Sequence, residues 1–369
     1  MLIKLAAAVM IMLSAYGSDA YGGDISMQQM EASGAYELEE HIPEGSLEMM
    51  EEAGVELTAD GVGELSLEGA AQSIADISEQ SVSTPLSACL AALGASVLCA
   101  AAGSGTRGDD LGRSYENLTA AAAVLSVCVP AAVFIDAAAD AIASLCGFSS
   151  VLVPVLAGLA YAGGHTASAA AYSGFTLAVI EGITLACSAV LVPCLRILLA
   201  VSAAGALCTS VDLGRLASAV EKSAKWLLGI MGVVLSGAMG VSAVAASAAD
   251  TAAAKGTRFV ISGAVPVVGG AISDAIGTIA NCVTIVRSSV GAFGIIAGLF
   301  ILLPPVITAL LWTGGLNLTA WAAHGLGAER PAAAMRSVAS VVSLTLGLLV
   351  FTGVVLTCSA GLIIALRSV

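Results

Sequence analysis

The sequence predicts an all-α polytopic membrane protein with six to eight spans rich in small residues. Of its 369 residues, 58% are hydrophobic and only 11% are charged, whereas soluble domains average roughly 45–50% and 25%. The apolar residues come in blocks of about 17 to 25, the length that crosses a hydrocarbon core of about 30 Å. Composition excludes an ordinary water-soluble surface, and block length indicates membrane helices.

Residues 1–20 have the pattern of a secretory signal peptide. One lysine, Lys4, precedes an apolar core from Leu5 to Leu13, and small residues follow up to Ala20. An uncleaved membrane anchor is the alternative. Both interpretations predict that the next region begins outside the cytoplasm.

Residues 21–84 form an acidic region that we expect to be extracytoplasmic. Fifteen acids and no Lys or Arg occur between Tyr21 and Gln80, so most of the net charge of −14 belongs here. Translocated segments typically lack Lys and Arg. Gly and Pro interrupt the region, which predicts short amphipathic helices, such as Leu65 to Ile77, and a docking role rather than a catalytic one.

Residues 85–369 are expected to form the polytopic transmembrane domain. Asp136 and Asp140 lack basic neighbours and are expected in an outer loop, while Arg107 and Arg113 predict a cytoplasmic loop. The expected spans lie at about 85–103, 118–135, 149–164, 175–207, 227–246, 290–312 and 338–366.

The tract 175–207 is too long for one ordinary span and predicts a kinked helix or a helical pair. Glu181 and Arg196 lie within it and are candidate intramembrane polar residues, since charges inside membrane segments usually mark functional positions.

Residues 211–226 predict an amphipathic helix on the cytoplasmic face of the membrane. Leu213, Leu216 and Val220 share one stripe, the charged residues lie elsewhere, and Trp226 falls at the expected headgroup boundary. Small residues then favour close helix packing in lipid, notably at Gly229, Gly232, Gly237 and Gly240.

The stretch SGAVPVVGGAISDAIG, residues 262–277, predicts a broken or re-entrant helix near 262–285. Pro266 removes a backbone donor and Gly269-Gly270 lowers the cost of leaving helical dihedrals. Ser273 or Gly270 is then expected to cap a second half-helix, with Asp274 in its first turn. These five residues form a candidate structural or gating element. The alternative is an interfacial helix after a loop, with Asp274 in water.

No catalytic, cofactor or metal site is expected. The phosphate-loop, zinc-protease and serine-hydrolase motifs do not occur, and the three histidines are dispersed. Residues 103–108 read GSGTRG, but they follow an apolar span and precede two aspartates, which favours a loop. The nine cysteines include no C-x-x-C pair and are interpreted as buried thiols.

Residues 250–305 closely resemble the stage III sporulation protein AE family of endospore-forming bacteria. The resemblance is carried by Val265-Pro266-Val267-Val268-Gly269, Ser273-Asp274-Ala275 and Pro304-Pro305. It extends from about Thr84 to the C-terminus, although this chain is richer in Ala and Gly in its spans.

The resemblance implies a non-enzymatic component of the transenvelope channel complex between mother cell and forespore. Such a protein would lie in the outer forespore membrane and be needed after engulfment for late forespore gene expression. Its partners would be other stage III sporulation membrane proteins and the lipid bilayer, with no nucleic acid. A permease for a small solute or ion is the alternative, and it predicts a cavity lined by groups such as Glu181, Arg196 and Asp274.

Overall fold

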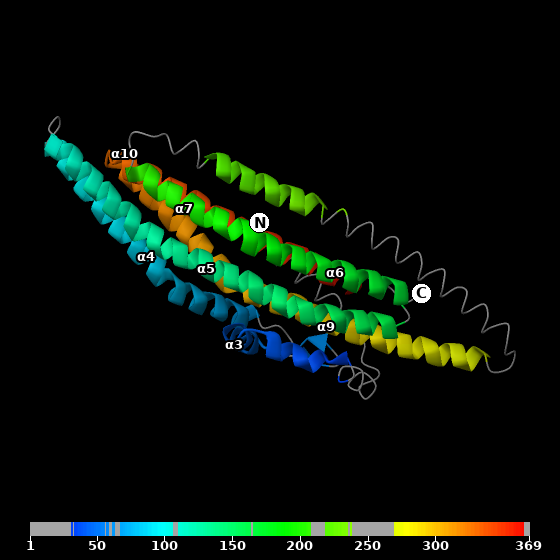
Figure 1. Ribbon diagram of the computed structural model, residues 1–369. Coiled ribbons are helices and arrows are strands. Elements are labelled where there is room, and N and C mark those ends of the chain that lie inside the picture. Colours follow the sequence, from blue (N-terminus) through cyan, green and yellow to red (C-terminus); the bar gives the residue numbers. More distant parts are fainter. Residues whose placement is uncertain are drawn as a thin grey trace.

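Long helices, packed side by side, form an elongated and gently curved bundle (Figure 1). A computed structural model of the chain describes residues 31, 33–55, 57–58, 61–62, 67–105, 110–163, 165–207, 218–234, 237 and 269–364. Within these ranges, five helices are long and apolar enough to cross a membrane. The all-α membrane class is therefore confirmed, although these five fall short of the six to eight spans expected.

Among the described residues, five long helical units form most of the bundle, and a shorter helical segment, 218–234, packs on the last of them. Helices α4 (Leu67–Gly105) and α5 (Asp110–Ala162) are consecutive, and α6 (Thr166–Ala186) returns along α5 and continues through a π-turn, η2 (Cys187–Leu191), into α7 (Val192–Leu207). Helix α9 (Gly269–Gly325) is followed by α10 (Glu329–Ile364) after a short turn in which Gly327 has a φ of 79°. That left-handed conformation costs glycine little, so the chain can reverse sharply there.

A small N-terminal subdomain packs against one side of the bundle. It consists of η1 (Ala35–His41), α3 (Glu44–Glu52) and a two-stranded antiparallel hairpin, β1 (Leu57–Thr58) and β2 (Gly61–Val62). The side chains of Leu38 and Met50 are fully buried within the same core as the bundle. We call residues 31–62 the acidic cap, because their glutamates lie on the outside. The hairpin was not predicted from sequence.

Helix α4 begins earlier than the expected first span. It starts at Leu67 and runs without interruption past residue 84, so its first turns come from the acidic region. Ser73 Oγ donates a hydrogen bond to Glu52 Oε2 at 3.3 Å, which ties α3 to the start of α4.

Helix α5 corrects the expected division at Asp136 and Asp140. Both residues lie in the middle of one 53-residue helix, where an outer loop between two spans was expected. A charge makes lipid burial costly but does not by itself interrupt a helix, and the surrounding alanines are the strongest helix formers. The outer-loop prediction is therefore wrong in secondary structure.

The long tract at 175–207 is one helical unit, because α6 passes directly through the π-turn η2 into α7. The structure therefore fits a single irregular helix and not the helical pair. Part of the expected amphipathic helix at 211–226 lies outside the described residues. Residues 218–234 are helical and pack on α10, where Gly232 approaches the ring of Phe351. Gly229 and Gly237 have open space around them, so of the three described glycines only Gly232 meets a neighbour.

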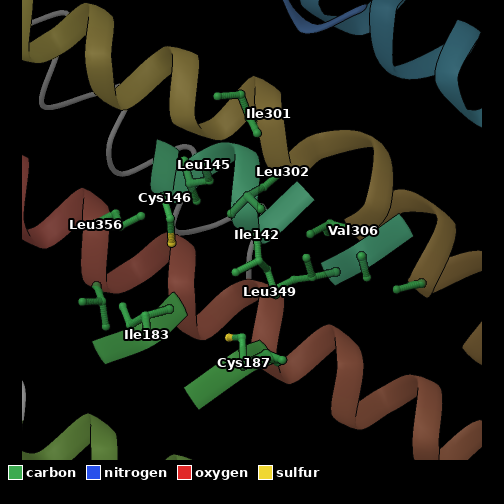
Figure 2. Close-up of a cluster of buried hydrophobic side chains, with 14 of the residues drawn as sticks. Ile142, Leu145, Cys146, Ile183, Cys187, Ile301, Leu302, Val306, Leu349 and Leu356 are labelled. Atoms are coloured by element: carbon green, nitrogen blue, oxygen red, sulfur yellow. The ribbon is translucent and has the colours of Figure 1, made fainter. Parts of the chain in front are cut away.

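One part of the core lies where α5, α6, α9 and α10 meet. Figure 2 shows aliphatic and thiol side chains from all four helices pointing toward one another, among them Ile142, Ile183, Leu302 and Leu349. Cys146 and Cys187 are part of this cluster and are free thiols. Of the seven cysteines whose burial is described, five are buried, which confirms their interpretation as buried thiols, but Cys194 is half-buried and Cys358 is exposed, so the interpretation is wrong for Cys358.

Leucine side chains of α5 pack against glycines of α9. A Cβ on Gly294 would lie 2.4 Å from Leu152 Cδ2, and one on Gly298 would lie 3.2 Å from Leu145 Cδ1. A side chain at Gly294 would require Leu152 to shift. Leucine side chains of α5 thus fill the space beside the glycines of α9, whereas the expected packing mode was close approach of two backbones.

Candidate functional site

One pair of charged side chains joins α5 to α7. Arg196 donates from Nη2 to Asp136 Oδ1 at 2.7 Å and from Nε to the same oxygen at 3.1 Å. The two side chains are 59% and 49% exposed, so the ion pair lies on the outer surface of the bundle and not in its core. Asp140, one turn further along α5, is also exposed.

Sequence reasoning singled out Arg196 but missed its partner. Asp136 was assigned to a loop, and the 60 residues between the two give no local signal of the pairing. The i, i+4 spacing of Asp136 and Asp140 inside an Ala-rich stretch was the available clue, because it places both carboxylates on one face of a helix.

Glu181 does not lie near the Arg196–Asp136 pair. It is exposed on α6, and about 22 Å of helix separates it from Arg196 at 1.5 Å per residue. The two candidate intramembrane residues therefore occupy separate positions on the surface.

A second charged pair lies on the helical segment 218–234. Lys225 Nζ contacts Glu221 Oε1 at 2.5 Å, and Glu221 also accepts a hydrogen bond from Ser340 of α10. Partial burial raises the pKa of Glu221, but these hydrogen bonds and the charges of Lys225 and Lys222 outweigh it, so the pKa lies below its ordinary value. Glu221 is thus held ionised beside α10.

The element expected near 262–285 is described only in part. The described part of α9 runs from Gly269 to Gly325 and includes Gly270, Ser273 and Asp274. The capping by Gly270 or Ser273 and the first-turn position of Asp274 stay predictions, because the residues before Gly269 lie outside the described ranges. Pro266, the helix expected to arrive from Phe259, and the side chains of Ser273 and Asp274 lie outside the described residues.

One cavity among the described residues lies between α5, α9 and α10. Its volume is about 20 Å³, enough for a single water molecule. Its walls are mostly aliphatic and glycine residues, and its two hydroxyls, on Ser149 and Thr357, already donate to backbone carbonyls of their own helices. Glu181 and Arg196 do not line it. This cavity is part of the packed core and is lined mainly by apolar groups.

The acidic cap has a buried apolar face and an exposed acidic one. Ala35, Leu38, Ile42, Met50 and Val55 face the bundle and are buried. The exposed glutamates are Glu31, Glu37, Glu39, Glu40, Glu44, Glu48, Glu51 and Glu52. Such a surface favours water and basic partners over acyl chains.

No group of three His, Cys, Asp or Glu side chains that could hold a metal ion occurs in the part of the chain that the structure describes. The long apolar helices define a helical membrane protein. Its described charged side chains lie mainly on the periphery, but Arg287 of α9 is buried in the interior, together with His165 and several Ser and Thr residues.

Comparison with known proteins identifies the family. The family model for stage III sporulation protein AE matches residues 109–366, which is most of the chain, so the chain belongs to that family. No curated protein and no solved structure matches it.

Proposed function

We propose that the protein is a non-enzymatic membrane component of the sporulation channel complex between mother cell and forespore. The family match over residues 109–366 carries this proposal, because membership implies a role in sporulation. The protein would lie in the outer forespore membrane and act after engulfment, when late forespore genes are expressed. Its partners would be other stage III sporulation membrane proteins.

The packing of the bundle supports a scaffold more than a permease. A transport path needs polar groups that converge on a cavity. Arg196 and Glu181 instead face outward on different parts of the surface, and the described cavity between α5, α9 and α10 is lined mainly by aliphatic groups. A scaffold that acts by packing its helices against partner proteins needs no such transport path.

Deletion of the gene in its endospore-forming host tests the proposal. Vegetative growth and engulfment should be normal, late forespore gene expression should fall to background, and a second copy of the gene should restore it. In engulfed cells the protein should co-purify with other stage III sporulation membrane proteins. Normal late gene expression in the deletion strain would contradict the proposed function.

A further inference from the structure

The helices of the bundle are longer than a membrane is thick. Helix α5 has 53 residues, which is about 80 Å at the α-helical rise, whereas a bilayer with its headgroups measures about 40–45 Å. One bilayer therefore encloses only part of a straight α5. The exposed side chains along each helix indicate which part.

The outward face of α5 changes character at Asp136. Before it, the exposed side chains are mainly large and aliphatic: Leu118, Leu125, Val129 and Val133. After it, the same face presents charged, small or polar residues: Asp140, Ala143, Gly147, Ser150, Pro154 and Gly158. The first set suits acyl chains, and the second suits water or protein.

Helix α4 shows the same change in the opposite chain direction. Its exposed residues are largely polar up to Gln80, including Asp76 and Glu79. Beyond that point it exposes Leu86, Leu90, Val97 and Leu98. Because α4 runs toward the short connection at which α5 begins, the aliphatic parts of both helices lie in the same half of the bundle.

Helix α9 agrees with α4 and α5. Between Val286 and Phe300 its residues are buried or half-buried, and its large exposed side chains begin at Leu310 and continue with Leu318 and Trp321. A Cβ on Gly315 would lie 3.0 Å from Cys89 Sγ of α4. This contact puts the exposed end of α9 beside the aliphatic part of α4.

A charged pair occurs where the aliphatic surface of α5 stops. Val133 is the last large aliphatic side chain that α5 exposes. Asp136 follows it within one turn and pairs with Arg196 of α7.

A second polar boundary closes the other end of the aliphatic surface. Arg330 of α10 donates a hydrogen bond to Asn117 of α5. Nδ1 of His324 lies 3.0 Å from Oε1 of Glu329. Trp321 is exposed one turn away. The helix from Asn117 to Asp136 measures about 28 Å, which matches a hydrocarbon core of about 30 Å.

We propose that the bilayer encloses only the half of the bundle between these two boundaries, and that the other half projects into water together with the acidic cap. The lipid-facing half contains 117–135 of α5, 81–103 of α4 and about 305–323 of α9. The projecting half contains the rest of α5, α6 and the buried part of α9. Its exposed large apolar side chains on α5 and α6 are scattered, as on soluble surfaces.

The acidic cap gives the orientation, because it lacks Lys and Arg and translocated segments typically lack both. Arg113 lies in the first turn of α5, and Arg330 and Arg336 lie in the first turns of α10, at the opposite end of the lipid-facing half. Arg196, Lys222, Lys225 and Arg287 lie elsewhere, so the base-free cap and not the number of bases carries the orientation. The projecting half is therefore extracytoplasmic.

Two cysteine substitutions on the same face of α5 test this placement. Val129→Cys lies in the lipid-facing half, and Gly147→Cys lies about 27 Å further along, with no atom near its new Cβ. Each is made in a variant without the native cysteines, reconstituted in vesicles and labelled with bimane. We expect quenching of the Gly147→Cys label mainly by aqueous iodide and of the Val129→Cys label mainly by nitroxide lipids.

The unmodified chain gives an independent measurement if the cysteine-free variant fails to fold. Hydroxyl-radical footprinting in nanodiscs should oxidise Tyr161 and Leu185 of the projecting half and spare Leu125 and Leu318. All four side chains are exposed in the bundle, so the bilayer is what distinguishes them. Lipid quenching at both cysteine positions, or equal oxidation of the two pairs of residues, would overturn the proposal.

Discussion

Arg196 Nη2 lies 2.7 Å from Asp136 Oδ1 and joins two helical positions that are 60 residues apart, at the edge of a surface of exposed aliphatic side chains. The environment of this pair determines its strength. In water an exposed ion pair contributes roughly 0.2–1 kcal/mol to the free energy of unfolding. When a pair is shielded from water, removing one partner destabilises the protein by about 3–5 kcal/mol, because the other charge is left buried and unpaired.

A double-mutant cycle measures that environment. We expect Asp136→Asn and Arg196→Gln to show a coupling free energy of about 0.2–1 kcal/mol, from unfolding of the reconstituted protein. The Glu221–Lys225 pair, in which Lys225 is exposed and Glu221 half-buried, is the control, since i, i+4 pairs give about 0.3–0.5 kcal/mol. A coupling above about 2 kcal/mol would place the Arg196 pair in a water-free environment.

Replacement of Gly294 by alanine should destabilise the bundle. Its new Cβ would meet Leu152 Cδ2 at 2.4 Å, and overpacking of this kind costs about 1–3 kcal/mol. The melting temperature should fall and recover partly when Leu152→Ala is added. Gly314→Ala, on the same helix but in open space, is the control. Equal melting temperatures for the two alanine variants would show that Leu152 moves aside at little cost.

The first residues of α9 are expected to be required for function. Gly269→Leu combined with Gly270→Leu adds bulk where the helix begins, and we expect it to abolish sporulation at normal protein levels. Asp274→Asn should be tolerated, because a neutral side chain near a helix start loses only about 0.5–1 kcal/mol of dipole energy. Sporulation efficiency measures both. Wild-type sporulation of the double leucine strain would mark an ordinary loop, and failure of Asp274→Asn would favour the permease.

The acidic cap and the turn between α9 and α10 should lie on opposite sides of the membrane. Gly45→Cys in the cap is exposed with space around its Cβ, and Leu326→Cys lies in the exposed turn. In a cysteine-free background, an impermeant maleimide on intact protoplasts should label only Gly45→Cys. Labelling of Leu326→Cys alone would reverse the orientation, and labelling of both would contradict separation by a bilayer.

Sequence patterns predicted the helical class because hydropathy and the scarcity of charge are local properties. The division of α5 was not predicted correctly, since Asp136 and Asp140 were used as signs of a loop. Helix continuity depends on backbone propensity, which the neighbouring alanines supply, and not on the solvent around the side chains. Charge patterns therefore indicate membrane boundaries more directly than they indicate helix ends.

The partners of individual residues were beyond sequence reasoning. The abundance of small residues predicted close packing but not which residues would meet. Gly294 of α9 contacts Leu152 of α5, a residue far away in the sequence. Arg196 was singled out as a charge in an apolar tract, whereas its pairing with Asp136 depends on how α7 lies against α5. Such contacts are set by tertiary packing, for which a single sequence contains no local signal.

The π-turn Cys187–Leu191 sets the angular phase of everything that follows it in α7. A π-turn accommodates one residue more than an α-helical turn, and each residue of an α-helix advances the side-chain direction by about 100°. Because the π-turn takes up this extra residue, α7 keeps nearly the angular position that it would have without the residue. If Cys187–Leu191 became regular α-helix with all five residues kept, Arg196 would rotate by about that angle, away from Asp136. The π-turn thus keeps the guanidinium and the carboxylate in the same sector of the bundle.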